Sequence, residues 1–205
     1  MFNVNQLELL VLINQSVYCA AYIPSIVKNY RMKTGTGWSW GMLYTFFNGY
    51  LASIFYFCCL RLPICWRISV FFQLFCIMIL FSQRLYYGVF TYKSVLIILG
   101  FSFSIGLALA IIPLALRCSS LVGNAAEWIS FGIGLISRLP QIIKIHRERS
   151  VYGFSYTTQC IMGIASLMEI GIVLAYKLPL QSLASSVWSL ILFVIFTIQF
   201  YWFAG

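Results

Sequence analysis

The chain has 205 residues, of which 62% are hydrophobic and only 8% are charged, and its mean hydropathy is +0.94. Since a soluble domain has about 25% charged residues, this composition excludes a soluble protein and predicts an integral membrane protein. Lys and Arg number thirteen against four acids, so the formal net charge is +9. These basic residues are spread over short loops, which is typical of multispanning proteins and argues against a nucleic-acid partner.

Seven apolar segments are each long enough to cross a bilayer, which takes about 20 residues in a helix. They lie at about 7–27, 38–59, 67–86, 93–115, 124–144, 156–176 and 183–203. The first eight residues lack the basic start and the cleavage site of a removable signal peptide. We therefore expect the first segment to stay in the protein as a spanning helix, within one membrane domain that covers residues 1–205.

The distribution of positive charge predicts the orientation in the membrane. The loops after spans 1, 3 and 5 carry eight basic residues: Lys28, Arg31, Lys33, Arg84, Lys93, Lys144, Arg147 and Arg149. The opposite side carries four: Arg61, Arg67, Arg117 and Lys177. Because cytosolic loops are richer in Lys and Arg, we expect a lumenal or extracellular N-terminus and a cytosolic C-terminus.

Two stretches of the chain repeat each other without a gap. Residues 21–39 read AYIPSIVKNYRMKTGTGWS and residues 137–155 read SRLPQIIKIHRERSVYGFS, so that Pro24 aligns with Pro140 at an offset of 116 residues. The prolines fall in spans 1 and 5, which run the same way through the membrane. The sequence therefore predicts two parallel three-helix repeats, at 7–86 and 124–203, joined by an inverting span at 93–115.

The repeated phrase itself has the form of a known motif. A transmembrane Pro-Gln followed by basic residues, Gly and Ser, duplicated in a seven-helix chain, resembles the PQ-loop family. That family includes lysosomal cystine and cationic amino-acid exporters, and its fold is similar to that of the sugar-exporting SWEET proteins. Leu139-Pro140-Gln141 is a full match to the motif, whereas Ser25 stands where the family usually has Gln.

Other features are similar to one branch of that family, the mannose-P-dolichol utilization proteins. The features are Pro63 and Trp66 before span 3, Gln73 within it, Tyr87-Gly88 at its end, Arg138 before the second motif, and the final aromatic run at 200–202. This resemblance implies an endoplasmic reticulum protein that supports the use of dolichol-phosphate-linked sugars.

The motif residues have a mechanical and a static interpretation. A proline within a helix removes a hydrogen bond and kinks the helix, so Pro24 and Pro140 are either paired hinges or fixed kinks. Gln141 offers two donors and an acceptor beside its kink. Ser39 and Ser155 are candidate caps of the next helices, after turns at Gly37 and Gly153. The basic residues that follow each motif are expected to anchor the cytosolic ends by contact with lipid, or to bind a phosphate-bearing headgroup. They are Lys28, Arg31 and Lys33 in the first repeat, and Lys144, Arg147 and Arg149 in the second.

Ionisable residues inside the spans are the first functional candidates, since each is costly in lipid. Arg138 and Glu169 lie on different helices and can form either a salt bridge or a pair that contacts substrate. Glu169 can instead take up a proton in coupled transport, or face lipid as a protonated acid. Glu127 lies eleven residues before Arg138, about 16 Å along a helix, too far for direct pairing.

Uncharged polar residues in the spans add three candidates. Asn48 and Gln159 are expected to bond substrate in a central cavity or to join helices to each other, and Gln73 has the same two interpretations. Asn14-Gln15-Ser16 matches the glycosylation pattern, but it falls inside span 1, where the modification is inaccessible.

Catalytic and metal chemistry have little support in the sequence. The single histidine, His146, has no paired acid or nucleophile, and we expect neither an enzyme nor a cofactor. The first functional hypothesis is use or movement of a dolichol-phosphate-linked sugar. The second is a lysosomal or vacuolar carrier of an amino acid or sugar, in which Glu169 replaces the intramembrane Asp expected of proton-coupled relatives. The third is a scaffold or receptor on the same fold.

Overall fold

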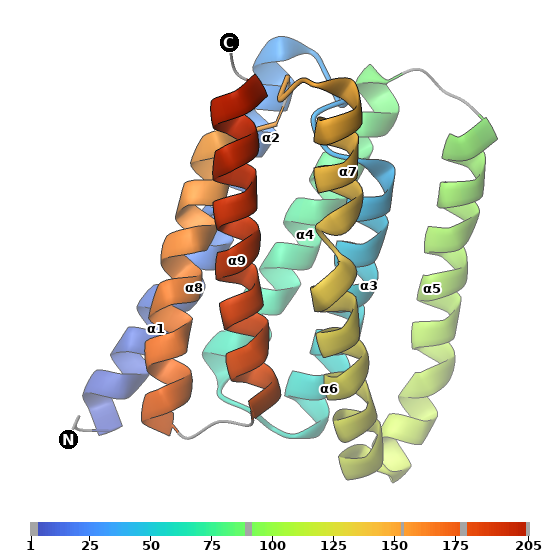
Figure 1. Ribbon diagram of the computed structural model, residues 1–205. Helices are drawn as coiled ribbons and strands as arrows, with labels where there is room; N and C mark the ends of the chain where they lie inside the picture. The colour runs from blue at the N-terminus through green and yellow to red at the C-terminus, as the bar shows by residue number, and fades with distance from the viewer. Residues whose placement is uncertain (1–3, 89–91, 153, 177–179, 204–205) are drawn as a thin grey trace.

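The computed structural model describes residues 4–88, 92–152, 154–176 and 180–203, and within them all regular structure is helical (Figure 1). The helices are α1 (Val4–Ala20), α2 (Ile23–Met32), α3 (Trp40–Cys59), α4 (Ile64–Tyr87), α5 (Tyr92–Arg117), α6 (Ser119–Ile136), α7 (Leu139–Glu148), α8 (Tyr156–Tyr176) and α9 (Leu180–Phe203). Six segments in this part of the chain are long and apolar enough to cross a membrane, the first of them formed by α1 and α2 together. The pair α6 and α7 runs alongside as the seventh. The predicted seven-helix membrane fold is confirmed.

The two motif prolines mark the starts of helices. Pro24 and Pro140 are the second residues of α2 and α7, in the first helical turn, where a missing backbone N–H removes no helical hydrogen bond. The helix is interrupted just before each proline and then begins again. These segments therefore end at Met32 and Glu148, later than the predicted ends at 27 and 144.

This extension corrects the expected position of the basic residues. Lys28 and Arg31 lie within α2, and Lys144 and Arg147 lie within α7, where loops were predicted. Lys33 and Arg149 follow these helices as their caps, each in a left-handed conformation. The side chains of Lys93 and Lys177, and all of Gly153, lie outside the described part of the chain.

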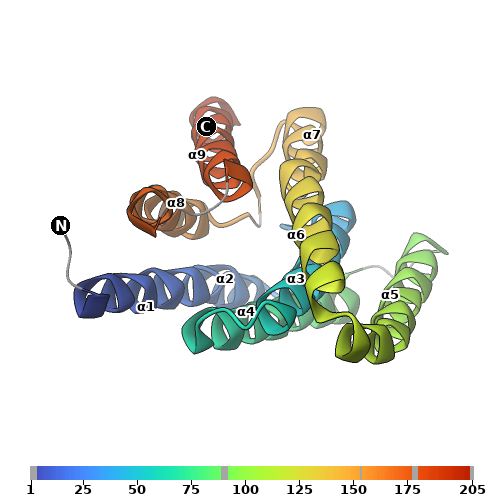
Figure 2. The same ribbon diagram turned by 90° about the horizontal axis from the view of Figure 1, so that it is seen from below.

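Six membrane segments form a closed ring, and α5 lies outside it (Figure 2). Around the ring, α1 contacts α4, α4 contacts α3, α3 contacts α6, α6 contacts α9, α9 contacts α8, and α8 returns to α1. In each repeat the third segment thus lies between the first and the second. The contact of α3 with α6 corresponds to that of α8 with α1, as expected for two parallel repeats related by an axis along the membrane normal.

The inverting helix α5 packs on the periphery against α3 and α6. Its outer face is apolar and exposed, with Leu96, Leu99 and Phe103 each at least 60% exposed, as expected for contact with lipid. α2, α7 and the end of α9 lie together at one end of the bundle, which we call the motif end, and α1 begins at the other (Figure 1).

Candidate functional site: a central cavity between the repeats

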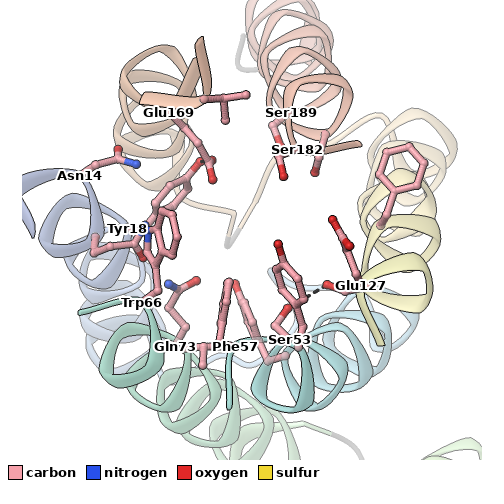
Figure 3. A pocket seen from close by; sticks show the side chains of 18 of the residues that line it. Asn14, Tyr18, Ser53, Phe57, Trp66, Gln73, Glu127, Glu169, Ser182 and Ser189 are labelled. Atoms are coloured by element: carbon pink, nitrogen blue, oxygen red, sulfur yellow. Dashed lines mark hydrogen bonds between the residues drawn. The ribbon is translucent and has the colours of Figure 1, made fainter. Parts of the chain in front are cut away.

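The ring encloses a cavity of about 270 Å³ (Figure 3). Its lining residues place it in the half of the bundle away from the motif end. Its deepest residues include Tyr22 and Arg138, which directly precede α2 and α7. The lining is unusually polar for a membrane interior: it combines amide, hydroxyl, carboxyl and guanidinium groups with aromatic rings. Since polar groups in spans are costly, this concentration favours a binding site for a polar solute.

The two repeats contribute equivalent positions to this cavity. The offset of 116 residues, seen in the motifs, relates lining residues on all three segments of each repeat. The pairs are Asn14 with Ser130, Gln15 with Phe131, Tyr22 with Arg138, Ser53 with Glu169, Tyr56 with Ile172, Phe57 with Val173, Trp66 with Ser182, and Gln73 with Ser189. The cavity therefore lies on the axis that relates the repeats. The paired side chains differ, so the wall from one repeat is chemically distinct from the other.

Arg138 is the one cation that lines the cavity within the described residues, and it is 7% exposed. Its Nη1 donates to the carbonyl of Ser189 at 3.2 Å, and its Nη2 lies 3.7 Å from the sulfur of Met162. Nearby, the hydroxyls of Tyr22 and Tyr50 are hydrogen-bonded to each other. All of these partners are uncharged.

Glu169 also lines the cavity, but it is not paired with Arg138. The hydroxyl of Tyr18 donates to Oε2 of Glu169 and lies 3.5 Å from the Ser166 hydroxyl. Lys144 with Glu148, at 3.8 Å, is the ion pair found among the described residues. The salt bridge considered between Arg138 and Glu169 is therefore not formed here, and the carboxyl group is instead hydrogen-bonded to Tyr18 on α1.

Two further side chains in the lining have polar atoms without partners. Asn14 is fully buried, and neither its amide nitrogen nor its amide oxygen has a hydrogen-bond partner in the described structure. Oε1 of Glu127 is likewise unpartnered. By contrast, Ser130, the repeat counterpart of Asn14, is bonded to Ser53 at 2.8 Å. Buried polar groups are normally hydrogen-bonded, so the free Asn14 amide is a candidate ligand contact.

Of the three uncharged candidates from the sequence, one lines the cavity. Gln73 does so, and its amide nitrogen donates to the Ser69 hydroxyl at 2.7 Å. Asn48 is not among the lining residues, and its amide nitrogen donates to the carbonyl of Tyr44 on its own helix. Gln159 is 1% exposed near the start of α8, in the motif-end half, and its amide has no partner within the described chain.

At the motif end, Gln141 joins the two repeats. Its Oε1 accepts from the backbone N–H of Ser39 at 2.6 Å, and its Nε2 donates to the carbonyl of Gly37 at 2.8 Å. Ser39 in turn caps α3, since its hydroxyl accepts from the N–H of Met42. Gln141 is 1% exposed and contributes nothing to the cavity lining. Its contacts are therefore structural, between α7 and the segment leading into α3.

The first motif makes the equivalent contact in the other direction, from the first repeat to the second. Ser25, which occupies the position equivalent to Gln141, bonds the Thr158 hydroxyl at 2.8 Å. Thr158 lies in the first turn of α8, whose cap is Ser155, as predicted. A Ser side chain suffices here because its partner is a side-chain hydroxyl, whereas Gln141 has to reach the backbone between α2 and α3.

Two of the predicted basic anchors also form hydrogen bonds between the repeats. Lys28 donates to the carbonyl of Phe154 at 2.8 Å, and Lys144 donates to the carbonyl of Thr36. Each lysine thus binds the other repeat instead of standing free at the surface. The remaining four anchors are exposed: Arg31, Lys33, Arg147 and Arg149.

A pair of glutamines shows the same symmetry. Nε2 of Gln83 donates to the carbonyl of Ile26 at 3.0 Å, and Nε2 of Gln199 donates to the carbonyl of Ile142, also at 3.0 Å. Both the donors and the acceptors are 116 residues apart. The third segment of each repeat is therefore tied to the helix that follows the proline.

Sequence reasoning did not select several residues of this site, above all Tyr18, Tyr22, Tyr50 and Asn14. Tyrosines are common at membrane interfaces, so their presence in apolar segments carried little signal. The offset of 116 residues, continued beyond the motifs, aligns Tyr22 with Arg138 and was the available clue. Among the described residues, no group of three His, Cys, Asp or Glu side chains is placed to hold a metal ion.

Comparison with known proteins agrees with this internal symmetry. No curated protein matches the chain. A family model described as the PQ loop repeat matches twice, at residues 8–65 and 122–182, which together make up more than half of the chain. Each match covers the first two segments of one repeat, including its motif. The protein therefore belongs to the PQ-loop repeat family of multi-pass membrane proteins.

Proposed function

We propose that this protein is a membrane carrier that binds a small polar solute in the central cavity and moves it by alternating access. The observation that carries the proposal is the position of a polar cavity of about 270 Å³ on the repeat axis. Cavities that hold drug-sized ligands measure about 300–1,000 Å³, so this one suits a single sugar or amino acid. It acts, on this proposal, by binding and conformational change without covalent chemistry.

The bundle consists of a half that holds the cavity and a half that is closed, as the proposed alternating access requires. The cavity occupies one half of the bundle, while the other half is closed by hydrogen bonds between repeats from Ser25, Lys28, Gln141 and Lys144. Breaks in the first segment of each repeat lie at the boundary between the halves. Rocking of the repeats about these breaks would open the motif end and close the cavity on the other side.

The first candidate for the solute is the sugar head of a dolichol-phosphate-linked sugar in the endoplasmic reticulum. Sugars present hydroxyls on a partly apolar ring, and the cavity offers Ser53, Ser182, Ser189 and Gln73 beside the ring of Trp66. The second candidate is a free amino acid or sugar in a lysosome or vacuole. It is favoured by the closed ring of helices, in which each segment contacts the next, because a free solute has no lipid chain that must pass between helices.

The experiment that tests the proposal compares cells that lack the protein with cells in which it is restored. Truncated lipid-linked oligosaccharides, corrected by the wild-type protein, would support the first candidate. Normal lipid-linked oligosaccharides would overturn that candidate. Uptake of labelled amino acids and sugars into vesicles that contain the purified protein then tests the second, and absence of any flux would contradict the carrier proposal itself.

A further inference from the structure

We infer that the solute carries a negatively charged oxygen group, a carboxylate or a phosphate, and that Arg138 binds it. This inference rests on the proposed function, in that it assumes a solute in the cavity. It specifies the chemical class of that solute and the side chain that selects it.

The first argument is that the fold does not require an arginine at this place. Arg138 directly precedes α7, and the equivalent residue before α2 is Tyr22. Both residues stand two positions before the motif proline and line the same cavity. Since Tyr22 occupies the first break without any charge, the geometry of the break does not explain the charge of Arg138.

The second argument is the absence of a counter-charge in the described structure. A guanidinium has five N–H donors, and Arg138 directs only two contacts to protein, one to the Ser189 carbonyl and one to the Met162 sulfur. Of the two acids in the cavity, Glu169 is hydrogen-bonded to Tyr18, and Glu127 makes no ion pair with Arg138. A buried charge without a partner is strongly unfavourable, and an anionic ligand removes that cost.

The third argument is the independent polar group at Asn14. Its amide is fully buried, lines the same cavity and has neither donor nor acceptor partner among the described residues. An amide can accept from a hydroxyl or an amine and donate to an oxygen. A solute with a carboxylate or phosphate and a second polar group would satisfy both Arg138 and Asn14. Arg is the side chain best shaped for such oxyanions, because its planar fork forms two parallel hydrogen bonds.

The test is binding to the purified full-length protein in detergent, measured by isothermal titration calorimetry with matched charged and uncharged probes. One arm compares mannose 1-phosphate with mannose, and the other compares N-acetylglycine with its uncharged amide. A further titration with dolichyl phosphate in mixed micelles separates a lipid-borne phosphate from a free one. We expect wild-type protein to bind the anionic member of at least one arm at least about 10-fold more tightly than its uncharged counterpart.

The variants assign the effect to Arg138. Arg138→Gln should weaken binding of the preferred anion by at least about 10-fold, down to the level of the uncharged probe. Arg138→Lys keeps the charge without the planar fork and should give an intermediate affinity. Arg117→Gln, on the exposed end of α5, is the matched control and should bind as the wild type does. If Arg138→Gln does not fold, the inference is still tested by the affinity of the lysine variant and by the preference of the wild type for the anionic probes.

Three outcomes are contrary to expectation. Equal binding of charged and uncharged probes would overturn the anion inference and leave the carrier proposal standing. So would unchanged anion binding by Arg138→Gln. Failure of every probe to bind the wild-type protein would count against the inference and the carrier proposal together.

Discussion

At the scale of single residues, the cavity separates two ionisable groups that the sequence suggested as partners. Arg138 is held by a carbonyl and a thioether, while the carboxyl of Glu169 is held by the Tyr18 hydroxyl. Tyr18 and Glu169 come from different repeats, on α1 and α8. A change in the protonation of Glu169 would therefore act on a contact between repeats, which is the contact that must change if the repeats rock.

Replacing Glu169 with Gln tests whether this carboxyl takes up a proton during transport. We expect Glu169→Gln to lower uptake driven by a proton gradient by at least about tenfold, because the amide cannot be protonated, while solute exchange without a gradient continues. Uptake of a labelled solute into vesicles measures both rates. Glu8→Gln, at an exposed position of α1 outside the cavity lining, is the matched control. A variant that keeps full gradient-driven uptake would exclude Glu169 as the proton site.

At the scale of elements, the motif joins helices across the repeat boundary. Gln141 at the start of α7 bonds the backbone that leads into α3, and Ser25 at the start of α2 bonds the first turn of α8. The motif side chains thus close the end of the bundle that is opposite the cavity. Next to them, a Cβ on Gly41 would come within 2.9 Å of the Pro140 ring, so α3 and α7 approach closely only because that position is glycine.

The two motif side chains are expected to contribute unequally to stability. Gln141→Ala leaves the Ser39 N–H and the Gly37 carbonyl buried without partners, at about 1–3 kcal/mol for each group. Ser25→Ala leaves only the buried Thr158 hydroxyl without this partner and should cost about 1–3 kcal/mol for that one group. The midpoint of thermal unfolding in detergent, measured for both variants, should therefore fall further for Gln141→Ala. An equal or larger fall for Ser25→Ala would contradict the role assigned to the glutamine.

At the scale of the whole molecule, an odd number of membrane segments places the two ends of the chain on opposite sides (Figure 1). The four exposed basic anchors all lie at the motif end: Arg31, Lys33, Arg147 and Arg149. We propose that this end faces the cytosol, where anionic lipid and the positive-inside rule both favour it. The cavity half then faces the lumen in the present conformation.

Reporter fusions check this orientation. A cytosol-specific reporter should be active at the C-terminus, and an engineered glycosylation site added before Met1 should be modified. Reversing the four exposed anchors to Glu should weaken or invert both signals, because the charge difference between the two sides is removed. Glycosylation of a site added after Gly205 in the otherwise wild-type chain would refute the proposed orientation.

The sequence by itself determined the membrane class, the seven segments and the parallel repeats. Composition limits the fold to helices that satisfy their own backbone, and the gapless motif alignment sets the relation between the halves. The ends of α2 and α7 were placed too early because the predicted spans followed the apolar segments, whereas the helices continue through the basic residues beyond them. The division into 7–86, 93–115 and 124–203 remains a prediction.

Only the tertiary structure decided which polar residues meet. Gln73, Arg138 and Glu169 line the cavity, while Asn48 bonds its own helix and Gln159 lies in the closed half. The rotation of each helix about its axis decides this, and it is set by packing around the ring, which hydrophobic periodicity does not report when a helix is apolar on every face. For the same reason the partner of Glu169 proved to be Tyr18, on a helix 151 residues away in the chain, and Arg138 was left without an acid.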